Sequence, residues 1–133
     1  MMLRSYLLLA IVFFAFGCIS STKKAQLEEM TKMYARALQG GDQSELLNFV
    51  HPESQQQFMK NALALKGLQF SGVEVKKIFP DEKLNSAIVL MNLEYYSLED
   101  PSLLASVRQF NWAYDQQAKL WLLKDPSPFG SRQ

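Results

Sequence analysis

The sequence contains one cysteine, Cys18, and one histidine, His51. A single cysteine excludes an internal disulfide and a redox cysteine pair. A single histidine without clustered carboxylates leaves too few ligands for a metal site, so we expect no metal and no cofactor. The sequence also lacks a glycine-rich phosphate loop, a nucleophile elbow and internal repeats. It therefore gives no support for a P-loop protein, an α/β-hydrolase or a repeat protein.

An excess of charge is absent too. Without Arg4, which lies in the first seventeen residues, the fourteen basic residues become thirteen and equal the thirteen acidic ones. A protein that binds nucleic acid would carry a basic excess, so we expect no nucleic-acid partner. The remainder from Cys18 onward has the length of one small domain.

No apolar run reaches the roughly twenty residues that a transmembrane helix needs. The longest run extends from Tyr6 to Phe16, follows the positive charge of Arg4 and closes on Gly17. This layout is typical of a secretory signal, so we assign residues 1–17 to a signal peptide.

The stretch Ala15-Phe16-Gly17-Cys18 resembles the lipobox of bacterial lipoproteins, with a small residue directly before the cysteine. The resemblance implies that the Cys18 thiol is acylated, that the chain is cut before it, and that residues 18–22 form a short linker to the membrane. Ile19 stands where an inner-membrane retention signal would place Asp, which implies an outer-membrane lipoprotein facing the periplasm. Phe16 departs from the family pattern, so cleavage by the ordinary signal peptidase and release of a soluble protein is the alternative.

The hydrophobic spacing after the linker predicts helices first. Apolar residues three or four apart predict a helix over 23–39, which Gly40-Gly41 ends. Asp42 and Glu45 form a pair like a capping box at the start of a short second helix. His51-Pro52 breaks that helix, and Pro52 opens a third that runs to Lys66.

The period then changes to that of strands. We predict four strands: 68–79, 86–96, 103–114 and 119–123. Alternation along the second strand predicts one apolar face, formed by Ala87, Val89, Met91, Leu93 and Tyr95. A parity change at Ser71-Gly72 indicates a β-bulge. Residues 125–133 contain two prolines and a glycine and are expected to be irregular. The order predicts an α+β domain over 23–124, with N-terminal helices packed on a curved four-stranded antiparallel sheet.

Two stretches resemble the nuclear transport factor 2-like superfamily: YARALQGGDQSELLNFVHPE, over 34–53, and FNWAYDQQAKLWLL, over 110–123. The resemblance implies a cone-shaped sheet around the first helix, with an opening that serves as a pocket. Some members of that superfamily are isomerases, dehydratases or hydrolases, and others are non-catalytic binding modules. The cystatin-like arrangement, a helix wrapped by an antiparallel sheet, is the alternative because only four strands are visible.

Aromatic residues crowd the predicted strands, and Arg108 shares one strand face with three of them. Core packing is one reading of these residues, and a binding surface is the other, because interfaces are enriched in aromatic residues and Arg. The residues predicted for such a surface are Tyr34, Tyr96, Arg108, Phe110, Trp112 and Tyr114.

No convergent pair of titratable residues is visible, so we assign no catalytic residue. His51 is interpreted as a capping or solvated residue, and Glu94 and Asp115 as solvated acids. The sequence predicts a lipid-anchored, non-enzymatic envelope protein that binds another envelope protein or a small apolar ligand. The alternative is an enzyme of the cone pocket that uses an acid such as Glu94 beside Tyr96 or Tyr34.

Overall fold

The structure is a computed structural model that describes residues 19–132. The predicted signal peptide over 1–17 and the lipidation site Cys18 lie outside the described residues. Within the described part of the chain, no helix combines the length and apolar character needed to cross a membrane.

The first described helix, α2, spans Ile19–Gly40. It begins at Ile19 and not at Lys23, so residues 19–22, which were predicted as a linker before the helix, are helical. The sequence between Ile19 and Lys23 contains no glycine or proline that would interrupt the helix. The predicted C-terminus is confirmed, because Gly41 has φ 74° and its N–H donates to the carbonyl of Ala37 at 3.1 Å.

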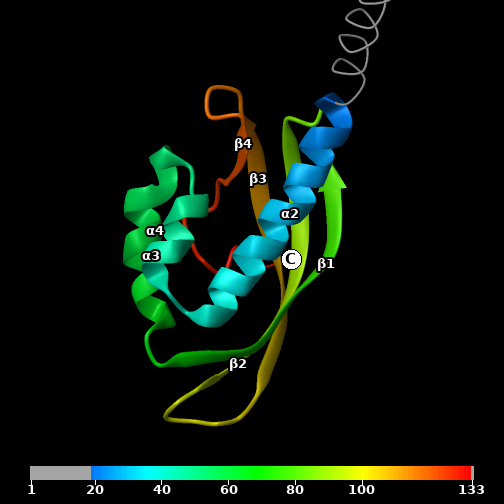
Figure 1. Cartoon of the computed structure of the whole chain (residues 1–133). Coiled ribbons are helices and arrows are strands. Elements are labelled where there is room, and N and C mark those ends of the chain that lie inside the picture. The colour runs from blue at the N-terminus through cyan, green and yellow to red at the C-terminus, as the bar shows by residue number, and fades with distance from the viewer. Residues whose placement is uncertain (1–18, 133) are drawn as a thin grey trace, which may run out of the picture.

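A series of short helical turns follows and packs beside α2 (Figure 1). Asp42 caps the first of them, accepting from the N–H of Ser44 at 3.0 Å, as its position predicted. The elements are α3 (Gln43–Leu46), η1 (Leu47–Phe49), η2 (Pro52–Ser54), α4 (Gln55–Ala62) and η3 (Leu63–Leu65).

The strands form an antiparallel sheet in the order β1-β2-β3-β4, curled into a half-barrel. Its strands are β1 (Leu68–Pro80), β2 (Ser86–Ser97), β3 (Leu104–Asp115) and β4 (Leu120–Leu123). The predicted bulge is confirmed by a register shift between Phe70 and Gly72, and a second, unpredicted shift lies between Val75 and Lys77. The α+β class with helices on a curled four-stranded sheet is therefore correct.

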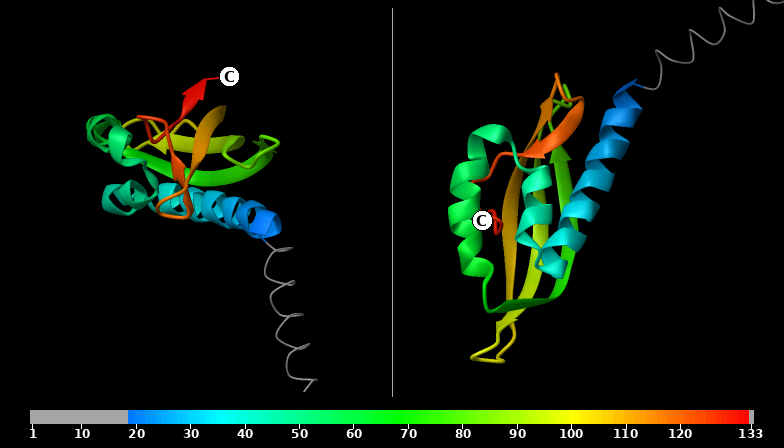
Figure 2. Two further views of the ribbon diagram at one scale, coloured as in Figure 1. Left: turned by 90° about the horizontal axis from the view of Figure 1, so that it is seen from above. Right: turned by 60° about the vertical axis from the view of Figure 1, so that its left-hand side comes forward.

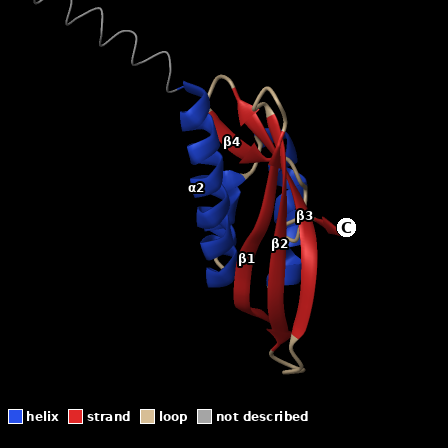
Figure 3. Ribbon diagram, turned by 90° about the vertical axis from the view of Figure 1, so that its right-hand side faces the viewer, coloured by secondary structure: helices blue, strands red, loops and turns tan. Residues whose placement is uncertain are grey.

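The core lies between α2 and one face of the sheet, which we call the concave face (Figures 1 and 3). Leu27, Tyr34 and Leu38 of α2 are fully buried against it. The predicted inward face of β2 is confirmed, with Val89 and Leu93 among its buried members. The opposite, convex face carries the partly or largely exposed residues Ile88, Glu94 and Tyr96.

Residues 125–132, here called the tail, are less irregular than predicted. The tail ends in a fifth strand, β5 (Ser131–Arg132), which pairs with β3 beyond the end of β4. Figure 2 shows α2 on one side of the curled sheet and the C-terminal strand projecting on the other. Composition alone misled here, because Asp125 and Pro128 are buried by contacts with distant parts of the chain.

Candidate functional site

A cavity of about 250 Å³ opens on the concave side of the half-barrel. Its walls come from η3, β1, β2, β3 and the tail, which are far apart in the sequence. The residues that line it are Ala64, Leu68, Leu93, Tyr95, Arg108 and Phe129. We call it the concave cavity. Four of its six lining residues are apolar, Tyr95 adds a hydroxyl group, and Arg108 adds one charge.

Aromatic rings form one side of the concave cavity. The ring of Phe129 lies 6.1 Å from that of Phe70 and 6.5 Å from that of Tyr95, and the last two are 5.8 Å apart. These centroid distances fall in the range in which aromatic pairs attract. The tail therefore supplies a ring that the sheet and helices alone would lack at this position.

Arg108 is the charged residue of the concave cavity. Its Nε donates to the carbonyl of Phe129 at 2.9 Å, which fixes the side chain and holds the tail against β3. Among the described residues, the ion pairs join Glu53 to His51 and to Lys124, and Glu74 to Lys76, so none involves Arg108. The cavity thus holds a positioned guanidinium without an acidic neighbour in an ion pair.

The predicted binding surface is wrong for three of its six residues. Tyr34, Phe110 and Trp112 have exposed fractions of 0%, 0% and 1% and belong to the core. The Tyr34 ring contacts the rings of Phe110 and Trp112 edge-on, at 5.7 and 5.8 Å. The shared strand face was correctly identified, but it is the concave face, and α2 covers it.

The other three residues do not lie together either. The ring centres of Tyr114 and Trp121 are 5.5 Å apart, and the ammonium of Lys23 lies 4.1 Å from the ring centre of Tyr114. Tyr96 lies on the convex face. Only Arg108 of the predicted six lines the concave cavity.

The acids considered from the sequence do not reach the concave cavity. Glu94 lies on the convex face, where its carboxylate covers Gly72 of the neighbouring strand. Asp115 accepts from the N–H of Gln117 at 3.0 Å in the β3–β4 turn. His51 behaves as expected, since its Nδ1 accepts from the N–H of Glu53 at 3.2 Å as the cap of η2.

One buried acid, Asp125, was missed by sequence reasoning. Its carboxylate accepts from the backbone N–H of Asn111 at 2.6 Å and from the side-chain amide of Asn111 at 3.0 Å. Burial raises the pKa of Asp125, and the hydrogen bonds from Asn111 oppose that rise. The only sequence signal was an acid beside Pro126 in a proline-rich segment, which says nothing about burial.

Asp125 also acts on Tyr34. Burial, and secondarily the negative charge of Asp125, raise the pKa of Tyr34 well above its usual value. The hydroxyl of Tyr34 donates to the carbonyl of Pro128 at 2.8 Å. Both groups are therefore engaged in holding the tail, and neither is free to exchange a proton with a molecule in the concave cavity.

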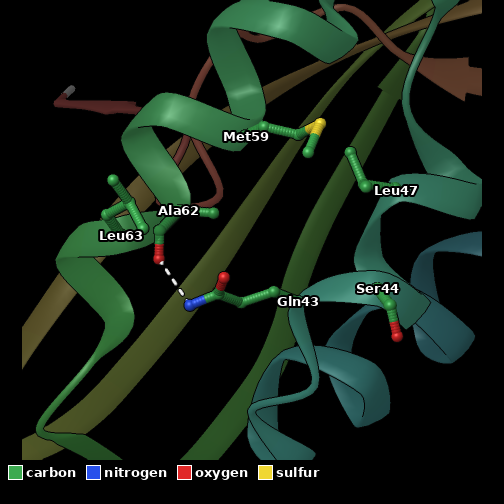
Figure 4. A pocket seen from close by; sticks show the side chains of 6 residues that line it. All are labelled: Gln43, Ser44, Leu47, Met59, Ala62 and Leu63. Atoms are coloured by element: carbon green, nitrogen blue, oxygen red, sulfur yellow. Dashed lines mark hydrogen bonds between the residues drawn. The ribbon is translucent and has the colours of Figure 1, made fainter.

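A second hollow, of about 320 Å³, lies between α3–η1 and α4 (Figure 4). We call it the helix groove. Met59 and Leu63 border it with exposed fractions of 56% and 57%, and Leu47 lies opposite. Gln43 bridges its floor by donating to the carbonyl of Ala62 at 3.0 Å. The groove is apolar and presents no titratable side chain in its lining.

Within residues 19–132, no group of three or more His, Cys, Asp or Glu residues is placed to hold a metal ion. The concave cavity and the helix groove are the two candidate binding sites that we consider, on the grounds of their shape and the apolar residues in their lining.

No protein-family model matches the chain, and no curated protein matches its sequence. The fold is similar to a crystal structure, at 1.75 Å resolution, of a SEC-C motif containing protein from Psychrobacter arcticus, with a TM-score of 0.59 and 15% sequence identity. The match covers 76% of this chain and 59% of that chain, so this chain spans less than two thirds of the length of its structural neighbour. At this identity the likeness shows the fold alone.

Proposed function

We propose that the chain is a lipid-anchored protein of the bacterial envelope, attached through acylated Cys18 to the outer membrane and facing the periplasm. Its domain is a non-enzymatic binding module of the nuclear transport factor 2-like type. Its ligand is a small apolar molecule held in the concave cavity. The observation that carries the proposal is this cavity, because apolar walls with few placed polar groups are typical of small-molecule sites.

The positions of the acids favour binding over catalysis. General acid–base work needs a titratable group within hydrogen-bond reach of the substrate. The described residues that line the concave cavity include no acid and no histidine. Glu94 lies on the opposite face, and the Tyr34 hydroxyl is directed at the carbonyl of Pro128.

The nuclear transport factor 2-like assignment, over the cystatin-like one, is supported by the place of the cavity. The resemblance implies a cone with an opening that serves as a pocket, and the concave cavity lies where β1, β2 and β3 meet η3 and the tail. The helical turns between α2 and β1 also fit that superfamily better than a single wrapped helix does.

Native mass spectrometry of the protein extracted from its own host's membranes tests the binding function. We expect the domain to retain a small molecule, and Ala64→Trp at the mouth of the concave cavity to remove it. Ala105→Trp is the matched control, because Ala105 is exposed at the start of β3 and pairs with Glu94 on the convex face, opposite the cavity. Loss of the molecule in both variants, or in neither, contradicts this site.

The helix groove favours a second candidate function, the binding of another envelope protein. Its exposed Met59 and Leu63 lie together with Leu47 in one apolar lining, and contiguous exposed apolar patches mark interaction sites. A protein that co-purifies in fixed stoichiometry is expected to be lost in Met59→Asp. The control Gln56→Asp adds the same charge on an exposed position of α4 and should keep the partner.

The anchor has its own test. The mass of the purified protein should show acyl groups on Cys18 as the first residue, and Cys18→Ser should release the protein from the membrane fraction. An unmodified chain that begins at Cys18 and fractionates as a soluble protein contradicts the anchor and supports ordinary signal cleavage.

A further inference from the structure

Two arginines face each other across the edge of the sheet beside the concave cavity. Arg108 of β3 and Arg132 of β5 are direct partners in the antiparallel pairing of these strands. Directly opposed residues of an antiparallel pair project to the same face of the sheet. The side chain of Arg132 therefore lies on the face to which Arg108 contributes the charge of the concave cavity.

This pairing is unfavourable by itself, because like charges directly opposite each other destabilise a strand pair. No acid compensates for it in the described part of the chain, since neither arginine takes part in an ion pair there. Asp125, the buried acid of the tail, already accepts two hydrogen bonds from Asn111. An anion between the two guanidinium groups would turn the repulsion into attraction for both.

We propose that the concave cavity binds a small amphiphile whose carboxylate is held by Arg108 and Arg132 and whose apolar body packs on Leu93, Tyr95 and Phe129. The inference rests on the proposed function and adds the chemical class of the ligand. Arg108, in the lining of the cavity, supplies the fixed contact, and Arg132, exposed and directly opposite Arg108 in the strand pairing, supplies the second charge.

The free donors of Arg108 favour a carboxylate. Its Nε is already engaged with the carbonyl of Phe129, which leaves the two terminal Nη groups. Those groups present parallel donors at the spacing of the two oxygens of a carboxylate. The volume of the cavity, about 250 Å³, equals that of roughly eight water molecules at about 30 Å³ each, which suits a short chain or a single ring.

The probes are octanoate, its uncharged counterpart 1-octanol, and octyl phosphate. Each is titrated into the full chain in a lipid nanodisc, and binding is followed by the methyl signals of Leu93 and Ala64 in NMR spectra. Leu98, exposed in the β2–β3 loop, is the reference for partition into lipid and for non-specific effects. Site-specific shifts therefore report the concave cavity alone.

We expect octanoate to bind at least tenfold more tightly than 1-octanol. Arg108→Gln should weaken octanoate binding about tenfold or more, and Arg132→Gln about threefold, with 1-octanol binding unchanged. Arg36→Gln, on an exposed position of α2, is the matched control and should change neither. Because Arg108→Gln also removes the bond to Phe129, the exposed Arg132 provides the variant that leaves the fold intact.

Equal binding of octanoate and 1-octanol would contradict an anionic ligand. Unchanged octanoate binding in both Arg108→Gln and Arg132→Gln would contradict it as well. Either result leaves the proposed binding function of the concave cavity intact. Octyl phosphate binding tenfold more tightly than octanoate overturns the carboxylate in favour of a phosphate head group. If none of the three probes shifts the signals of Leu93 or Ala64, the proposed function of the concave cavity fails as well.

Discussion

The hydroxyl of Tyr34 in α2 donates a hydrogen bond of 2.8 Å to the carbonyl oxygen of Pro128 in the tail, 94 residues later in the chain. The bond is fully buried, and it joins the first described helix to the segment that completes the concave cavity. It shows how a tail of little regular structure becomes part of the core.

Replacement of Tyr34 by Phe tests this link. Tyr34→Phe keeps the ring and leaves the carbonyl of Pro128 without its donor, so the free energy of unfolding should fall by about 1–3 kcal/mol. Chemical denaturation measures the change. Tyr96→Phe, on the convex face, removes the same atom from a partly exposed residue and should cost less than about 0.5 kcal/mol. Similar losses in the two variants would show that the tail does not depend on Tyr34.

The two buried tryptophans provide a matched comparison. The indole N–H of Trp121 donates to the carbonyl of Lys23 at 2.9 Å, whereas that of Trp112 is buried without a partner among the described residues. Trp121→Phe therefore loses packing and a hydrogen bond, and Trp112→Phe loses packing and an unsatisfied donor. We expect Trp121→Phe to be more destabilising by about 1 kcal/mol, measured by thermal or urea unfolding. The reverse order contradicts the assignment of these donors.

Gly130 should resist substitution more strongly than Gly41. Both have positive φ values, 64° and 74°. A Cβ at Gly130 would collide with the backbone carbonyl of Gln109, but a Cβ at Gly41 meets nothing within 4 Å. Gly41→Ala should cost about 1–2 kcal/mol for its conformation alone, and Gly130→Ala clearly more, because β5 must move. Hydrogen exchange at Ser131 and Arg132 would report the release of β5, and equal costs would argue against the close approach.

Asp125 should give the stability a distinctive pH dependence. Burial raises its pKa in the folded state above the ordinary value of 3.8, so between these two values the folded state holds a proton that the unfolded state has released. The contribution of Asp125 to the free energy of unfolding therefore falls as the pH rises through that window, and is constant above it. Unfolding of the wild type and of Asp125→Asn, from about pH 3 to 8, isolates this contribution in the difference between the two curves.

Three exposed acids behave in the opposite sense. Hydrogen bonds from Ser44, Asn85 and Ser102 lower the pKa values of Asp42, Asp81 and Asp100 respectively. The stabilisation of the folded state by these acids is therefore complete above their pKa in the unfolded state and is lost as the pH falls. They are unchanged in Asp125→Asn and cancel in the difference. A flat difference curve would contradict the burial of Asp125.

Glu94 separates the binding proposal from the enzymatic alternative. Glu94→Gln should leave stability, and octanoate binding in the concave cavity, unchanged within error, because the carboxylate covers Gly72 on the other face of the sheet. Isothermal titration and thermal unfolding measure the two quantities. A loss of turnover on any substrate, with the fold retained, would instead favour an enzyme.

The sequence predicted those parts of the fold that depend on local pattern. Alternation along β2 identified its buried face, the parity change at Ser71-Gly72 identified the bulge, and Asp42 and Gly41 marked helix ends. Each of these signals comes from residues a few positions apart, where backbone geometry fixes which side chains share a face.

Contacts between residues far apart in the chain could not be predicted from the sequence. Periodicity placed Phe110 and Trp112 on one face of β3, but it could not tell that α2 covers that face. The tail was misjudged for the same reason, since Pro126, Pro128 and Gly130 describe the path of the backbone and not the partners of Asp125 or Phe129. The concave cavity is built from five separate segments, so only Arg108 of its lining had been predicted as a site residue.

The bond between Tyr34 and Pro128 also sets an order of events during biosynthesis. A chain that has been synthesised only as far as β4 lacks the Phe129 ring of the concave cavity and the Pro128 carbonyl that accepts from Tyr34, so its core is incomplete until residues 125–132 have emerged. Contacts across 94 residues also close slowly, because the loop between them must be ordered first. We therefore expect the core to be completed only after the last residues have been made, which agrees with the unfolded state that passage through a membrane would need if the signal proposed for residues 1–17 is used.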